Sequence, residues 1–233
     1  MLGSFFAPKA KIARARKHLA ELETEIGAYL TSQPARFETN ITDGPGLRRF
    51  DFVMHLRQPG PLFSSIVGDV IHNLRASLDV AACDLVRWNE RTAAANVGDV
   101  KFPICKHAKN FDLIIRKGAL NRMGAAAVDI IRNLKPYPTG NAILCGIHDL
   151  DVQDKHTTLV VAMVAVGAPI ISRWDDDGTM NPTLVGDPTA PSELRIIFPA
   201  PGPFAGKPIV ETLRECINIT ASAIESFRAL AHT

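Results

Sequence analysis

Cysteine is scarce in this chain, and its four copies are not spaced like those of a metal site or a disulfide scaffold. No C-x-x-C pair occurs, and at least three of the cysteines fall in apolar helical or strand patterns. We therefore expect reduced, buried thiols in a cytoplasmic protein and no structural zinc. The four positions are Cys83, Cys105, Cys145 and Cys216.

The sequence also lacks an excess of charge of either sign and a long apolar run. Its 26 Lys and Arg nearly balance its 24 Asp and Glu, so overall charge would not draw it onto nucleic acid or an anionic membrane, and any basic patch must be local. The longest uncharged apolar run, residues 159–171, is too short for a bilayer, which needs about 20 residues. At the amino terminus, apolar residues precede basic ones, the reverse of a secretory signal. We expect no membrane partner.

Common cofactor and metal motifs are missing as well. No G-x-G-x-x-G or G-x-S-x-G occurs, and the segment 202–208 resembles a phosphate loop but is one residue short and ends in proline. His72, the pair His148-Asp149 and Asp154 follow the order found in metal-dependent HD phosphohydrolases, but Asp154 should lie on a different helix face from His148. The sequence therefore predicts neither a cofactor nor metal ligands.

Hydrophobic periodicity predicts an α+β protein. Helices are expected over 8–30, 62–88, 111–122 and 125–134, from 141 onward, and over 208–231. Strands are expected over 36–41 and 48–56 as a hairpin, at 102–104, and over 160–173, 183–185 and 194–198.

The order of these elements predicts one domain spanning residues 1–233. Its helical core would cover about 61–160, followed by a β-rich segment at about 160–200 and a closing helix at about 208–231. We expect an antiparallel sheet that joins the N-terminal hairpin to the C-terminal strands.

The helix expected over 62–88 carries a polar row opposite its apolar stripe. The row consists of Asp69, His72, Arg75 and Asp79. The residues that surround Asp79 on the helix are mostly apolar, so Arg75 and Asp79, which are four residues apart, should enter a partly dry environment and pair. Because Arg has five donors, one carboxylate cannot satisfy it.

A second polar stretch lies on the helix that begins near residue 141. Its apolar stripe predicts burial at the position of Asp154, and a buried carboxylate needs a cation. We expect Arg75 to be that cation, with Lys155 as a local second choice. His148 and Lys155 share a neighbouring face, and His156 falls near the end of the helix.

These residues resemble a family of uncharacterised bacterial proteins. The pattern G-D-x-x-H-N-L-R-x-x-L-D begins at Gly68 and is followed by F-P-I at 102–104 and by D-K-H at 154–156; the likeness covers about residues 48–165. The central helix also resembles the motif helix of the HEPN superfamily, helical domains that often cleave or bind RNA. That motif places a His four to six residues after the Arg, where this chain has Val80.

Two interpretations follow. The resemblance implies an HEPN-like protein, of the kind found in defence or toxin systems, with a degenerate catalytic motif and RNA or nucleotide phosphate as its partner. The residues it implies for catalysis are Arg75, His72 and His156, and those for binding are Asn73, Asp79, His148, Asp154 and Lys155. The alternative is a non-enzymatic structural or interaction protein, self-associating or bound to a protein partner, in which Arg75, Asp79 and Asp154 only hold helices together.

Overall fold

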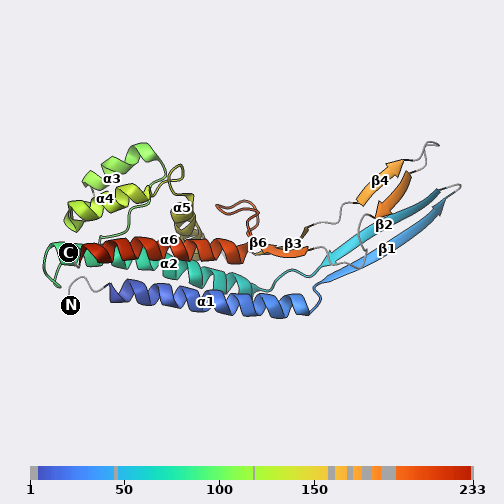
Figure 1. The fold of residues 1–233 in the computed structure, drawn as a ribbon, viewed down its shortest axis with the longest axis horizontal. Helices are drawn as coiled ribbons and strands as arrows, with labels where there is room; N and C mark the ends of the chain where they lie inside the picture. The colour runs from blue at the N-terminus through green and yellow to red at the C-terminus, as the bar shows by residue number, and fades with distance from the viewer. Residues whose placement is uncertain are drawn as a thin grey trace.

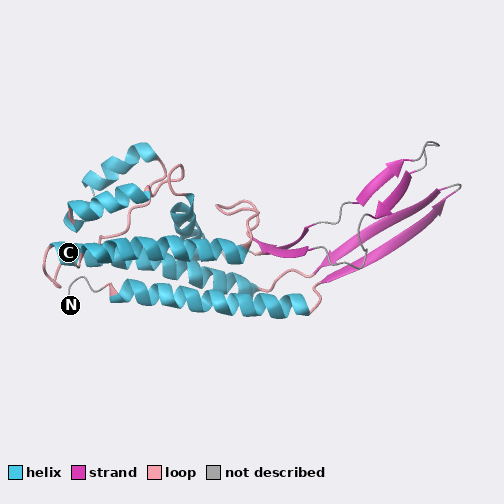
Figure 2. Ribbon diagram, in the orientation of Figure 1, coloured by secondary structure: helices cyan, strands magenta, loops and turns pink. Residues whose placement is uncertain are grey.

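The structure, a computed structural model, describes residues 5–44, 47–117, 119–156, 161–166, 170–174, 180–184 and 193–231. These residues form a bundle of helices from which strands extend as an arm (Figures 1 and 2). The predicted α+β class is confirmed, with the helices forming most of the structure. Along the parts of the chain that the structure describes, none of the helices has the length and apolar composition to cross a membrane.

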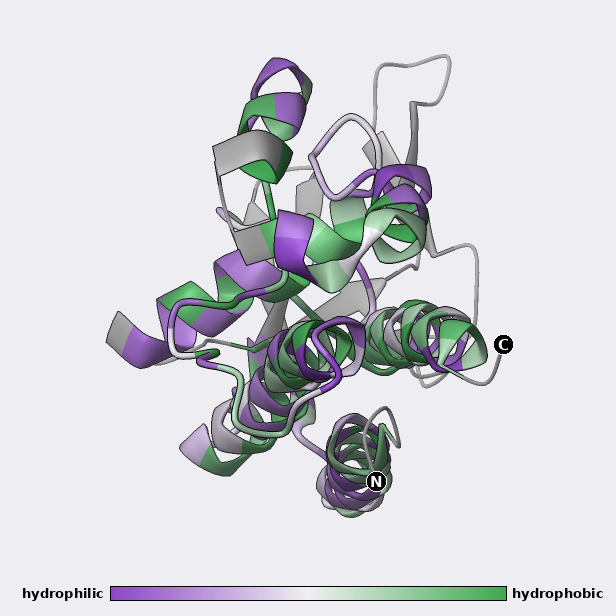
Figure 3. Cartoon of the chain, turned by 90° about the vertical axis from the view of Figure 1, so that its left-hand side faces the viewer, coloured by the Kyte–Doolittle hydropathy of each residue, from purple (hydrophilic) through white to green (hydrophobic). Residues whose placement is uncertain are grey.

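Three long helices make up the body of the bundle. They are α1 (Phe6–Thr31), α2 (Pro61–Asn89) and α6 (Ile209–Leu230), and each contacts the other two. Pro61 occupies the first turn of α2, where its missing N–H costs nothing, and Arg87 lies in the last turn, where a cation complements the helix dipole. In the end-on view of Figure 3, the long helices carry apolar residues on one side and polar residues on the other.

Short helices and 3₁₀ turns follow α2 along the chain, and several of them pack against α2 or α6. The helix expected over 111–122 is in fact α3 (Phe111–Lys117) followed by a 3₁₀ turn, η2 (Ala119–Met123). A further 3₁₀ turn, η1 (Ala108–Asn110), precedes α3, and α4 (Ala125–Leu134) follows η2. The last of the short helices, α5 (Ala142–His156), contacts both α2 and α6.

The strands pair as three antiparallel ladders. The predicted hairpin is confirmed: β1 (Ala35–Gly44) pairs with β2 (Leu47–Leu56). The strand expected over 160–173 contains two separate strands, which pair with different partners. They are β3 (Ala162–Val166), paired with β6 (Glu193–Ile197), and β4 (Ile170–Trp174), paired with β5 (Met180–Leu184). Within the described residues the hairpin pairs only with itself, so the single joined sheet that we expected is not formed.

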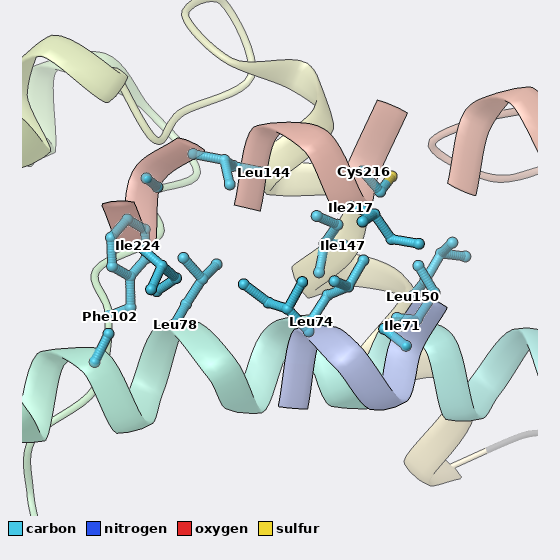
Figure 4. Close-up of a cluster of buried hydrophobic side chains, with 14 of the residues drawn as sticks. Ile71, Leu74, Leu78, Phe102, Leu144, Ile147, Leu150, Cys216, Ile217 and Ile224 are labelled. Carbon is cyan, nitrogen blue, oxygen red and sulfur yellow. The ribbon is translucent and has the colours of Figure 1, made fainter. Parts of the chain in front are cut away.

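Part of the hydrophobic core lies where α5 and α6 meet α2. Ile71, Leu74 and Leu78 of α2 are fully buried there against side chains of the other two helices (Figure 4). Phe102 also packs into this cluster, and the centroid of its ring lies 6.3 Å from that of Phe227 on α6. Burial of each such side chain stabilises the fold by about 1.5–3 kcal/mol. The predicted burial of at least three cysteines is confirmed for Cys105, Cys145 and Cys216, and all four are free thiols.

Candidate functional site

The polar row on α2 lies along its interface with α5. Gly68 lies against Asp154, and His72 hydrogen-bonds to Asp151. Farther along, Arg75 and His148 line one pocket. Residues with rising numbers on α2 therefore contact residues with falling numbers on α5. The two helices run antiparallel, and the polar row of α2 faces α5.

Arg75 and Asp79 form the predicted ion pair and together hold the F-P-I segment. The Nη2 atom of Arg75 lies 2.9 Å from Oδ1 of Asp79 and donates to the carbonyl oxygen of Phe102 at 3.1 Å. The same Oδ1 accepts the backbone N–H of Phe102 at 2.8 Å. The prediction of a strand at 102–104 is wrong, because these side chains take the place of a neighbouring strand as hydrogen-bond partners.

The predicted contact between Arg75 and Asp154 is wrong. Asp154 is exposed, and its carboxylate oxygens lie 2.7 Å from where a Cβ would stand on Gly68. Partial burial, with the nearby charges of Asp151 and Asp69, raises the pKa of Asp154 above its ordinary value. The second-choice partner is also wrong, because Lys155 lies 2.5 Å from a carboxylate oxygen of Asp151.

Asp151 is the buried carboxylate of α5. It is 3% exposed and accepts hydrogen bonds from His72 Nδ1 at 3.0 Å and from Lys155. The error has a simple cause: the fully buried face of α5 includes Leu144, whereas Ile143 is only partly buried. Positions 151 and 154 lie about 60° apart around a helix, so a small rotation of the buried face about the helix axis exchanges one carboxylate for the other.

Beside the Arg75 ion pair lies a pocket of about 280 Å³ between α2, α5 and the short helices. Its lining residues are Arg75, Asp99, Lys101, Phe102, Pro103, Ile104, Ile114, Leu120 and His148. Most of them are apolar, and the exceptions are two cations, one carboxylate and one imidazole. Such a mixture of apolar walls with a few polar groups is typical of small-molecule sites.

Two buried nitrogen atoms of residues that line this pocket have no hydrogen-bond partner among the residues that the structure describes. They are Nη1 of Arg75, a residue that is only 6% exposed, and Nδ1 of His148. Burial and the charge of Arg75 lower the pKa of His148, so the imidazole is neutral at pH 7. Burial also lowers the pKa of Arg75, against the opposing effects of Asp79 and Asp151, yet a guanidinium stays charged at pH 7.

The remaining predicted residues lie elsewhere. Asn73 donates to the backbone oxygen of Asp69 in its own helix at 2.8 Å, and half-exposed His72 is held by Asp151, outside the residues that line the pocket. His156 is the last residue of α5, and its side chain lies outside what the structure describes. Among the residues that the structure does describe, no cluster of His, Cys, Asp or Glu is arranged to hold a metal ion.

Two functional candidates were missed at the level of sequence: Lys101, which lines the pocket, and the backbone of Phe102, which Arg75 and Asp79 hold. A cation directly before F-P-I was the available signal for Lys101. Nothing local to Phe102 indicated that its peptide groups would bind side chains of a helix 23 residues earlier.

Comparison with known proteins adds no assignment, because no family model, curated protein or solved structure matches this chain.

Proposed function

We propose that this protein binds a phosphate-bearing ligand, RNA or nucleotide, in the pocket beside Arg75, as an HEPN-like protein with a degenerate catalytic motif. The observation that carries the proposal is the pair of buried, unpartnered nitrogen atoms on Arg75 and His148. A buried polar group without a partner costs about 1–3 kcal/mol, and an oxyanion with several oxygens would accept from Nη1 of Arg75 and from Nδ1 of His148 when that nitrogen carries a proton.

Binding without cleavage is the form of this activity that the residues support. In the HEPN-like mechanism the His transfers a proton and the Arg stabilises phosphate charge, and Val80 does not transfer protons. The nearest imidazole to Arg75 along the pocket is His148, which burial keeps neutral. The same interpretation places the protein in the cytoplasm, where RNA and nucleotides are available, and in a defence or toxin system.

The test is a titration of the full chain with a short fluorescent single-stranded RNA and with a fluorescent nucleotide, followed by anisotropy. Lys101→Ala should weaken binding at least tenfold, because Lys101 is an exposed cation of the pocket. Lys109→Ala removes another exposed cation, which is not one of the residues that line the pocket, and should change little. Equal binding by the two variants, or no binding by the unaltered protein, would refute the proposal.

RNA integrity in the same mixtures addresses catalysis. Total RNA incubated with the protein should stay intact and be retained, while an Arg75→Ala variant should retain less. Cleavage by the unaltered protein that Arg75→Ala abolishes would show that another group does the work of the missing His.

A structural or interaction role is the second candidate, and a specific observation favours it. Nη2 of Arg75 contacts the Asp79 carboxylate and the Phe102 carbonyl, and both contacts hold residue 102 against α2. This is a structural role. In that case phosphate ligands would not bind, and the partner would be a second copy or another protein. Sedimentation velocity over a hundredfold range of concentration would detect self-association.

A further inference from the structure

The pocket offers three donors that a single terminal phosphate matches. They are Nη1 of Arg75, Nδ1 of His148 when it carries a proton, and the ammonium group of Lys101, a residue of the pocket lining; the first two have no partner among the described residues. A phosphomonoester presents three acceptor oxygens, whereas the phosphodiester inside an RNA strand has only two non-bridging oxygens. The donor set therefore favours a terminal phosphate over an internal one.

The charges around His148 also favour a terminal phosphate. Arg75 pairs with Asp79 on α2, whereas Asp99 of the segment before Phe102 lies 3.9 Å from Arg122, which is not one of the residues that line the pocket. From its own helix, Asp149 and Asp151 face His148. An anion bound beside His148 would favour a proton on the imidazole, because an opposite charge stabilises the charged form.

Size and burial limit what can carry the phosphate. The volume of about 280 Å³ lies just below the usual range for ligand pockets, about 300–1,000 Å³. The wall of Pro103, Ile104, Ile114 and Leu120 is an apolar surface against which a planar base would fit. Neither unpartnered nitrogen is exposed to solvent, so a ligand has to shift the covering side chains, and a duplex is too large to enter.

We propose that the pocket binds a nucleotide-sized phosphomonoester, with its phosphate between Arg75 Nη1 and His148 Nδ1 and its base on the apolar wall. This inference rests on the proposed function and narrows its ligand. The source is a free mononucleotide or the phosphorylated end of a single RNA strand, and both present the same chemistry.

Calorimetric titration of the full chain tests the proposal with five probes: 5′-AMP, inorganic phosphate, 3′,5′-cyclic AMP, and one RNA hexamer with and without a 5′-phosphate. We expect 5′-AMP to bind at least tenfold more tightly than inorganic phosphate, which has no base, and than cyclic AMP, which has no terminal phosphate. If the 5′-phosphate also strengthens hexamer binding at least tenfold, RNA ends are a source; if only 5′-AMP binds, free nucleotides are.

Proton uptake distinguishes recognition from general electrostatics. Titrations at pH 7 in two buffers of different ionisation enthalpy should show uptake of a proton by the unaltered protein, and none by His148→Gln. Lys101→Ala should weaken 5′-AMP binding with its uptake retained, and Lys109→Ala should match the unaltered protein. The Lys101 variant keeps the test informative if His148→Gln does not fold.

Different failures overturn different claims. Equal binding of cyclic AMP and 5′-AMP, or of the two hexamers with no binding of 5′-AMP, would overturn the phosphomonoester assignment and leave the proposed function intact. Absence of binding by all five probes would overturn both.

Discussion

The ion pair between Arg75 and Asp79 gives the sharpest prediction, because the two partners differ in burial. The Arg75 side chain is 8% exposed and that of Asp79 is 31% exposed. Asp79→Leu leaves a buried guanidinium without its counter-ion and removes the acceptor of the Phe102 N–H. We expect a loss of about 3–5 kcal/mol in the free energy of unfolding.

Arg75→Met should lower the free energy of unfolding by less, about 1–2 kcal/mol. It removes the buried cation and its bond to the Phe102 carbonyl, while solvent still reaches Asp79. Arg75→Met should also relieve much of the damage done by Asp79→Leu, because the double variant has no stranded charge. The expected coupling free energy is about 2 kcal/mol.

Urea unfolding of the four proteins in this cycle measures the coupling. A second cycle with Arg75→Met and Asp154→Leu is the matched control, and its effects should add to within about 0.5 kcal/mol because these two side chains do not meet. Additive costs in the first cycle, or strong coupling in the second, would contradict the geometry described for this interface.

Three further outcomes follow. Burial holds the pKa of His148 in the folded protein below its ordinary value of 6.5. The stability that neutral His148 contributes is therefore present above pH 6.5 and is lost as the pH falls from 6.5 through the lowered pKa. Melting temperatures of His148→Gln should not show this pH-dependent loss of stability. Gly146→Ala should destabilise by about 1–3 kcal/mol, since its Cβ would stand 2.4 Å from the buried ring of Phe204, whereas Gly68→Ala should be near neutral in urea because exposed Asp154 can swing away. Burial raises the pKa of Cys145 to about 11 and that of Cys216 to about 12, so a thiol reagent at pH 8 should modify half-buried Cys83 first and these two only in denaturant; prompt reaction of Cys216 in the native protein would refute its burial.

Local patterns in the sequence were enough to predict the long helices, the hairpin and the ion pair. Periodicity over many turns places α1, α2 and α6 correctly because their apolar stripes are long and continuous. Arg75 and Asp79 are neighbours on one helix, so their contact depends only on helical spacing. These features require no knowledge of how distant segments meet.

The contacts between distant segments were decided by tertiary structure. The rotation of α5 about its own axis sets whether Asp151 or Asp154 is buried, and a short helix with apolar residues on adjacent positions does not fix that angle. Residue 102 binds α2 through its backbone, whose hydrogen-bonding groups are the same in every sequence. For this reason the sequence determined which residues carry charge near the core, and only the folded chain determined that Arg75 shares a pocket with His148 and Lys101.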